Sequence, residues 1–113
     1  VICLCYNHER FVLQSLESVL GQTYAAVELI VVDDCSTDGS VVEIERALAG
    51  KAVPFIRNQQ NLGNCRAFNT GLRQARGKYV IDLAADDVLL PDRIAQQVAA
   101  FDALPSDYAV VFS

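Results

Sequence analysis

Apolar and polar positions alternate along the chain in two distinct patterns. Short apolar runs, several of them rich in β-branched residues, predict strands at 1–5, 27–32, 53–57, 79–84 and 109–113. Apolar residues with helical spacing predict four helices between them, at about 9–20, 41–50 and 64–76 and from a first-turn proline at Pro91 onward. This alternation predicts one α/β domain, a three-layer α/β/α sandwich around a mostly parallel sheet. We predict the strand order 3-2-1-4, with Pro54 keeping the third strand at the sheet edge.

The apolar positions of each predicted helix form one face. The first helix places Val12, Leu16, Val19 and Leu20 on this face, and the second places Val41, Ile44 and Leu48 there. In the third helix the face consists of small residues and one leucine, namely Ala67, Gly71, Leu72 and Ala75, which permits close packing on the sheet. The last helix carries Ile94, Val98 and Phe101.

The stretch 27–40 runs from a buried strand through two carboxylates into a turn and a helix. Asp33 and Asp34 stand directly at the end of this strand, and Asp86 and Asp87 end the fourth predicted strand. Ligands of open α/β sheets bind at the carboxyl ends of the strands, so we expect the two pairs to share one crevice. Two carboxylates, waters and ligand phosphates suit Mg²⁺ or Mn²⁺. Asp is also common in turns, and the alternative is that these acids only cap them.

Composition and motifs exclude several classes of protein. The 113 residues carry a net charge of −5 with scattered basic residues, which disfavours a nucleic-acid surface, and no apolar run is long enough to span a membrane. The four cysteines lack CxxC spacing, so we expect reduced thiols, a cytoplasmic setting and no zinc. Phosphate-binding glycine motifs are missing. The chain has only one histidine, His8, which we interpret as a solvated residue at a helix start, so we expect no Ser-His-Asp catalytic set.

Motifs in a fixed order along the whole chain carry a resemblance to a known family. They are Tyr6-Asn7 with Phe11, Ser18-Val19-Leu20 with Gln22-Thr23-Tyr24, the run 31–40, Asn61-Leu62-Gly63, the spaced set Gly63, Ala67, Asn69, Gly71, Ala75, Gly77 and Tyr79, and Asp86-Asp87 with Leu90-Pro91-Asp92. In these pieces the chain resembles the nucleotide-binding half of inverting, family-2-type glycosyltransferases with the Rossmann-like GT-A fold.

The resemblance implies roles for individual positions. Asp34 would hydrogen-bond the uracil or ribose of a UDP-sugar, and Tyr6 with its neighbour Asn7 would wall the base pocket. Asp86 and Asp87 would hold Mn²⁺ or Mg²⁺ against the diphosphate, to which Asp86 is then close. Arg66 on the third helix is a further candidate for a diphosphate contact, the alternative being a solvated helix face.

Three departures from the family pattern bear on these roles. Leu4 and Cys5 stand where Pro and a small polar residue are usual, and Ala84 stands at the first acid of a D-x-D motif. Asp82 lies mid-strand, where we expect a buried structural acid rather than a ligand. The third departure is an absence, because the resemblance places the catalytic base and the acceptor-binding half beyond residue 113. We therefore expect residues 1–113, as one nucleotide-sugar-binding unit, to bind donor weakly and to transfer nothing alone.

The sequence thus predicts part of a metal-dependent glycosyltransferase. Its partners would be a nucleotide-diphospho-sugar, with a saccharide or lipid-linked saccharide as acceptor, in bacterial surface polysaccharide synthesis. The resemblance implies a cytoplasmic enzyme that associates peripherally with the inner face of the cell membrane. Two alternatives are a degenerate nucleotide-sugar-binding module without activity and a sugar-nucleotide nucleotidyltransferase, which would need a glycine-rich loop that residues 5–10 lack.

Overall fold

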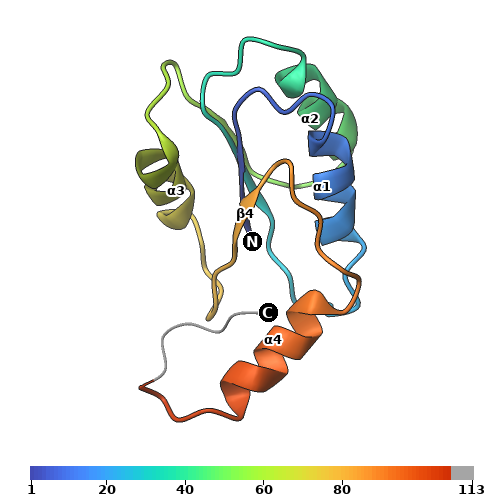
Figure 1. Cartoon of the computed structure of the whole chain (residues 1–113), viewed down its shortest axis with the longest axis vertical. Coiled ribbons are helices and arrows are strands. Elements are labelled where there is room, and N and C mark those ends of the chain that lie inside the picture. Colours follow the sequence, from blue (N-terminus) through green and yellow to red (C-terminus); the bar gives the residue numbers. More distant parts are fainter. Residues whose placement is uncertain (108–113) are drawn as a thin grey trace.

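The structure, a computed structural model, describes residues 1–107, and the strand predicted at 109–113 lies outside the described residues. Strands and helices alternate from the first residue on, as the sequence pattern predicts (Figure 1). The elements are β1 (Ile2–Cys5), α1 (Val12–Leu20), β2 (Ile30–Asp33), α2 (Ser40–Leu48), β3 (Phe55–Arg57), α3 (Asn64–Leu72), β4 (Asp82–Ala84) and α4 (Arg93–Asp102).

The described strands form one parallel sheet with the order β3-β2-β1-β4, which confirms the predicted order and the edge position of β3. In this order β1 lies between β2 and β4, with Cys5 opposite Asp33 and Leu4 opposite Ala84. β2 and β3 are thus added on one side of β1 and β4 on the other, so the strand order reverses at β1. The loops that follow β2, β1 and β4 leave the sheet side by side at its carboxyl edge.

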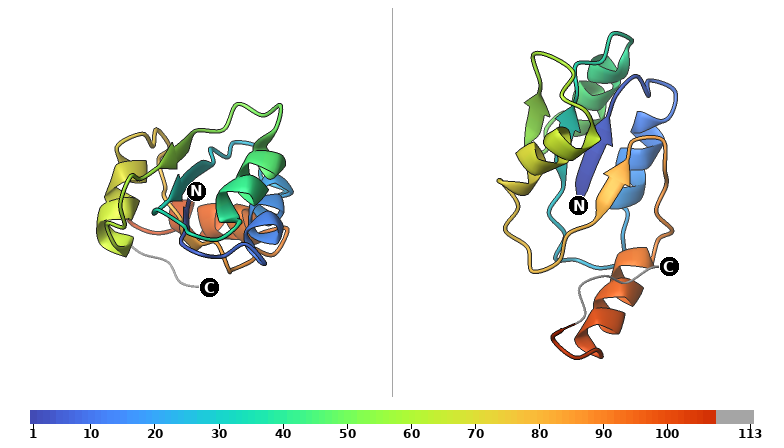
Figure 2. Two further views of the ribbon diagram at one scale, coloured as in Figure 1. Left: turned by 90° about the horizontal axis from the view of Figure 1, so that it is seen from above. Right: turned by 60° about the vertical axis from the view of Figure 1, so that its left-hand side comes forward.

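Helices cover both faces of the sheet, so the three-layer arrangement is confirmed (Figure 2). On one face, Cys3, Cys5 and Val31 pack against α1 and α2. On the other face, Ile2, Ile30 and Val32 pack against Ala67 of α3. Alternate residues of each strand serve opposite layers, as the two-residue period of a strand requires.

α3 lies very close to the sheet because of one glycine. A Cβ on Gly71 would stand 2.7 Å from Cγ2 of Ile2 and 3.2 Å from Cγ2 of Val32. The predicted small-residue face is thus confirmed for Ala67 and Gly71, which are buried.

Two helix-face predictions are wrong, for Leu20 and Leu72. These side chains are 42% and 41% exposed. At about 100° per residue, Leu20 lies about 80° away from Val12 around α1, and Leu72 lies about 140° away from Ala67 around α3. Both therefore point past the edge of the face that contacts the sheet.

Several predicted boundaries were also too generous. α3 ends at Leu72 rather than Arg76: the amides of Gln74 and Ala75 bond to the carbonyls three residues back, and the amide of Arg76 donates to the Glu28 carboxylate (2.9 Å). β4 begins at Asp82 rather than Tyr79, and Pro91 precedes the first residue of α4 by two positions. The ring of Tyr79 instead stacks on Phe101 of α4, with centroids 4.7 Å apart.

Candidate functional site

Backbone hydrogen bonds bring the two acidic pairs to either side of β1. The amide of Asp34 donates to the carbonyl of Cys5 (2.8 Å), and the amide of Ala85 donates to the carbonyl of Leu4 (2.9 Å). The loop that leaves β1, which begins with Tyr6, therefore lies between Asp34 and Asp86. The topology thus places both pairs at the carboxyl edge of the sheet, and the crevice that we expect them to share stays a prediction.

The first pair is used within the protein itself. Asp33 is 2% exposed, and its carboxylate accepts hydrogen bonds from the amide (2.9 Å) and the hydroxyl of Ser36. This closes the turn after β2 and lets Cys35 take a left-handed backbone conformation (φ 68°). Asp33 is thus a turn-closing acid, as the alternative interpretation of the pattern proposed.

Asp34 fastens the loop that precedes α3. Its carboxylate, in a residue that is 5% exposed, accepts from the side-chain amide of Asn58 (2.9 Å) and from the backbone amides of Leu62 (2.8 Å) and Gly63 (2.9 Å). Gly63 has a φ of 84°, a conformation that side chains rarely adopt. The three hydrogen bonds hold this turn beneath the first residues of α3.

Asn7 joins the loop after β1 to the loop after β2. It adopts a left-handed conformation (φ 57°), and its Oδ1 accepts from the amides of Thr37 (2.8 Å) and Asp38 (3.3 Å). The backbone amide of Asn7 donates to the hydroxyl of Ser36 (2.9 Å). Asn7 therefore shapes the loop that carries Tyr6 and His8, and its side-chain oxygen is already engaged.

A second link between these loops runs through Asp38. Its carboxylate accepts from the amide of Glu9 (3.2 Å) and from the amide (2.9 Å) and hydroxyl of Ser40. Desolvation raises the pKa of Asp38, but the hydrogen bonds from Ser40 and Glu9 outweigh it, and the pKa lies below its ordinary value. Asp38 is therefore ionised at neutral pH.

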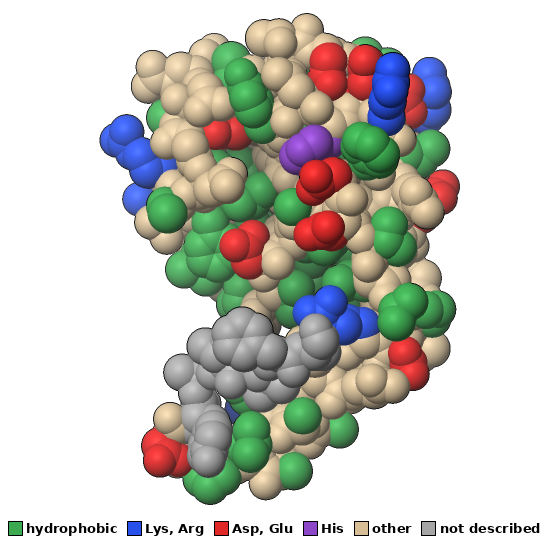
Figure 3. Space-filling view, in the orientation of Figure 1, with side chains coloured by type: hydrophobic (Ala, Val, Ile, Leu, Met, Phe, Trp, Pro, Cys, Tyr) green, Lys and Arg blue, Asp and Glu red, His purple; other side chains and the backbone are tan. Residues whose placement is uncertain are grey.

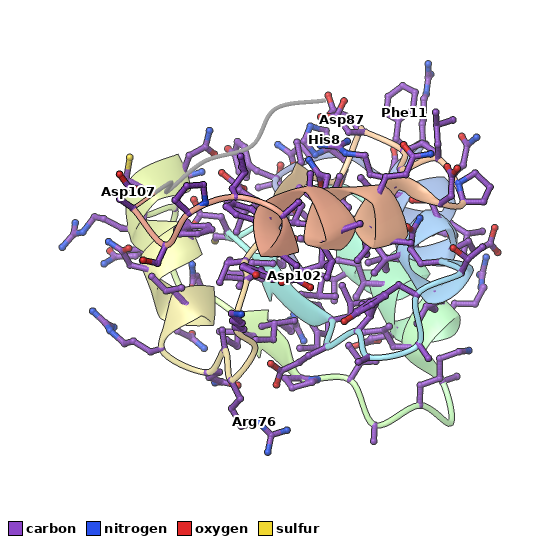
Figure 4. All side chains as sticks on the ribbon, turned by 90° about the horizontal axis from the view of Figure 1, so that it is seen from below. His8, Phe11, Arg76, Asp87, Asp102 and Asp107 are labelled. Atoms are coloured by element: carbon purple, nitrogen blue, oxygen red, sulfur yellow. The ribbon has the colours of Figure 1, made fainter. Side chains whose placement is uncertain are left out.

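The second pair is free of such hydrogen bonds. Within residues 1–107, the carboxylate of Asp87 takes part in no hydrogen bond or ion pair. The carboxylate of Asp86 has one polar contact in this range, with Nε2 of His8 at 3.7 Å. Figure 3 shows acidic side chains beside the histidine on one face of the molecule, and Figure 4 shows His8 and Asp87 on the same side. These two acids are available to a ligand, whereas Asp33, Asp34 and Asp38 are occupied.

His8 lies closer to this site than its sequence position indicated. We interpreted it as solvated, but its side chain is 27% exposed, it neighbours Asp86, and its Nδ1 is buried without a hydrogen-bond partner in the described part of the chain. The sequence signal that could have identified it is its place three residues after Cys5, the end of the strand at which the strand order reverses.

The remaining predicted residues occupy different surroundings. Tyr6 is 45% exposed at the end of β1, so its ring is accessible beside the site. Arg66 is exposed in the first turn of α3, and its guanidinium contacts no acid of the described residues. Asp82 is exposed, which contradicts the predicted buried acid, since β4 lies at the edge of the described sheet. Desolvation raises its pKa above the ordinary value.

The donor set fits a hard cation that keeps most of its own water. The described residues contain no group of three or more His, Cys, Asp or Glu side chains that could enclose a metal ion. Mg²⁺ and Mn²⁺ are typically held by one or two carboxylates together with ligand phosphates and water, and Asp86 and Asp87 offer two uncommitted carboxylates. All four cysteines are free, as predicted, and no described helix is long and apolar enough to cross a membrane.

Comparisons with known proteins identify the family and the fold. The family model for glycosyl transferase family 2 matches residues 1–113. The succinoglycan biosynthesis protein ExoO of Rhizobium meliloti is 33% identical over 109 residues, which cover 96% of this chain and 31% of ExoO.

Two solved structures extend the likeness to ligand complexes. S. aureus TarS 1-349 in complex with UDP is 28% identical with a TM-score of 0.79, over 89% of this chain and 31% of that one. The mannosyltransferase PcManGT from Pyrobaculum calidifontis, in complex with GDP-Man and Mn²⁺, is 29% identical with a TM-score of 0.80, over 93% and 32%. The chain thus spans about a third of the length of each of these three proteins.

Proposed function

Because this chain belongs to glycosyl transferase family 2, we propose that it is the donor-binding part of an inverting glycosyltransferase. The donor is a nucleoside diphosphate sugar, with UDP as the first candidate for the nucleotide. In the reaction, an acceptor hydroxyl oxygen bonds to the anomeric carbon as the bond from that carbon to the diphosphate oxygen breaks. The hydroxyl proton passes to a base, and we assign no residue of this chain to that role.

The single observation that carries the proposal is the difference between the acids. Asp33, Asp34 and Asp38 are held in loop hydrogen bonds, whereas the carboxylates of Asp86 and Asp87 are not. Two free carboxylates at the carboxyl end of a strand, beside the point where the strand order reverses, are where a phosphate-bearing ligand with its cation is expected.

Each residue then receives a role. Asp86 and Asp87 would hold Mn²⁺ or Mg²⁺, and such a cation would supply positive charge to neutralise a departing diphosphate. The exposed ring of Tyr6 walls the nucleobase. Asp34 and Asn7 shape the nucleotide site through the loops that they hold in place. Asp34 also accepts a hydrogen bond from the base or ribose, through a lone pair that the loop contacts leave free. Arg66, unpaired among the described acids, reaches the diphosphate.

The name of ExoO supports a role in polysaccharide synthesis, with a saccharide or a lipid-linked saccharide as the acceptor. Ala84 favours a second candidate function, because a metal site with one acid fewer fits a binding module that no longer transfers sugar. The two functions share the nucleotide site and differ in whether the protein that contains this chain releases nucleoside diphosphate in the presence of acceptor.

A thermal-melt comparison tests the nucleotide site itself. The chain is melted with UDP, GDP or ADP, each with Mn²⁺ or with EDTA. A ligand at about a hundredfold excess over its Kd stabilises the native state by about 2.7 kcal/mol. We expect one nucleotide to raise the melting temperature more with Mn²⁺ than with EDTA. If no nucleotide raises it at millimolar concentration in either condition, the melt is repeated on the whole protein that contains this chain, and the absence of a shift there as well means that the proposal is wrong.

A further inference from the structure

The segment between the acidic pair and α4 has no regular structure, yet it is fixed to α1. Within residues 88–92, Leu89 is buried in the core (4% exposed), whereas the side chains of Val88 and Leu90 are 49% and 70% exposed. Besides this one buried side chain, the segment is held by hydrogen bonds with Ser18 in the last turn of α1 and with Gln22, two positions after the last residue of that helix.

Gln22 uses its whole side-chain amide for this purpose. Nε2 donates to the carbonyl of Ser18 (3.0 Å) and to the carbonyl of Leu90 (2.7 Å), and Oε1 accepts from the amide of Ile94 (3.0 Å). Ile94 is the second residue of α4, a helix whose own N-cap, Asp92, makes no side-chain cap hydrogen bond. From the loop just after α1, Gln22 therefore caps α4 and satisfies an amide that helix geometry leaves without a partner.

Ser18 holds the segment at a second point. Its hydroxyl accepts from the amide of Leu89 (3.1 Å) and donates to the carbonyl of Ser15 (2.6 Å). Leu89 is 4% exposed, so its amide cannot turn to water for a replacement. The backbone amide of Thr23, next to Gln22, adds a hydrogen bond to the carbonyl of Pro91 (2.9 Å).

These contacts bracket the acidic pair. On one side the amide of Ala85 is bonded to β1, and on the other the amide of Leu89 is bonded to Ser18. Only residues 86–88 lie between the two anchors. Because neither carboxylate has a hydrogen bond of its own to orient it within residues 1–107, the anchored backbone sets where the two carboxylates stand.

We propose that Ser18 and Gln22 are positioning residues for the Asp86-Asp87 pair, which hold it in the geometry that binds the cation of a nucleoside diphosphate. The inference rests on the proposed function of the pair. It gives a physical reason for the Ser18 and Gln22 motif of the sequence, which no other role in the site explains.

The test compares Ser18→Ala and Gln22→Ala with a matched control, Gln14→Ala, which removes an exposed amide from the same helix. Calorimetry measures the Kd of UDP, or of GDP if the chain prefers it, with Mn²⁺ and with EDTA. Loss of a supporting residue around a metal ligand typically weakens metal binding about 10- to 100-fold. We expect the Mn²⁺-dependent gain in affinity to fall about tenfold in both variants, while the Kd in EDTA and the behaviour of Gln14→Ala stay unchanged. Ser18→Thr keeps the hydroxyl and should restore the gain.

Amide hydrogen exchange without ligand tests the same inference independently of nucleotide binding. We expect the amides of Leu89 and Ile94 to exchange faster in Ser18→Ala and Gln22→Ala respectively, with Gln14→Ala unchanged. If the unsubstituted chain shows no Mn²⁺-dependent binding, the Kd values are measured in the whole protein that contains this chain; if binding is missing there too, the proposed function fails and exchange alone decides the positioning. If binding is present but the variants keep the full Mn²⁺ gain, or if the two amides exchange as before, the inference is overturned.

Discussion

Replacement of Asp34 by Asn separates a loop-holding acid from a ligand-binding one. The Asp34 carboxylate accepts three hydrogen bonds, from Asn58, Leu62 and Gly63, in a residue that is 5% exposed. An Asn amide retains one acceptor oxygen and places an NH₂ group against one of these donors. If the Asn oxygen replaces Oδ1, which serves Asn58 and Leu62, the new NH₂ group faces the Gly63 amide, which then keeps only its longer hydrogen bond to Oδ1 of Asn61 (3.2 Å). The change loses one charge-assisted hydrogen bond, about 1.5–3 kcal/mol, and places an NH₂ donor without an acceptor at a position that is 5% exposed, about 1–3 kcal/mol.

We therefore expect Asp34→Asn to lower the free energy of unfolding by about 3 kcal/mol, and the melting temperature by about 10 °C. Urea unfolding followed by circular dichroism, without nucleotide or metal, measures the difference. Asp87→Asn is the matched control, because its carboxylate has no hydrogen bond in the described residues, and it should stay within about 0.5 kcal/mol of the unsubstituted chain. An Asp34→Asn variant as stable as the control would refute the loop-holding role.

Two further predictions concern the core. Gly71→Ala would place a methyl group 2.7 Å from Cγ2 of Ile2, so we expect a loss of about 1–3 kcal/mol in urea unfolding, and an unchanged stability would mean that α3 stands further from the sheet. Burial raises the pKa of the Cys3 thiol to about 12 from 9.0. Above pH 9 the unfolded chain loses this proton while the native chain keeps it, so the free energy of unfolding should fall between pH 9 and 12 and should fall less in Cys3→Ala, a difference that urea unfolding at several pH values would reveal or disprove.

The order of elements and the sheet topology could be predicted because they follow from patterns local in sequence. Alternating strands and helices with right-handed crossovers leave few arrangements, and the acids at two strand ends favoured the order 3-2-1-4. Helix ends were harder to predict. After α3 the amides of Gln74 and Ala75 bond three residues back, and the amide of Arg76 then donates to Glu28, 48 positions away in the sequence, a partner that no local pattern shows.

The site could be located from the sequence, but the use of each acid could not. Asp33, Asp34, Asp86 and Asp87 look alike as residues that follow a strand. What distinguishes them is the partners of Asp34, which lie 24 to 29 positions further along the chain. The contact of His8 with Asp86 spans an even larger separation, so the sequence shows only that His8 follows the end of β1 and not which acid it contacts.

Anomalous X-ray scattering from Mn²⁺, in crystals of this chain grown with UDP or GDP, would locate the cation directly. The account predicts one strong anomalous peak within coordination distance of the Asp86 or Asp87 carboxylate, with the diphosphate on its other side. In Asp86→Asn/Asp87→Asn crystals this peak should be missing. A peak at Asp33, Asp34 or Asp38 in place of the second pair, or a bound nucleotide whose diphosphate lies away from Asp86 and Asp87, would contradict the central claim.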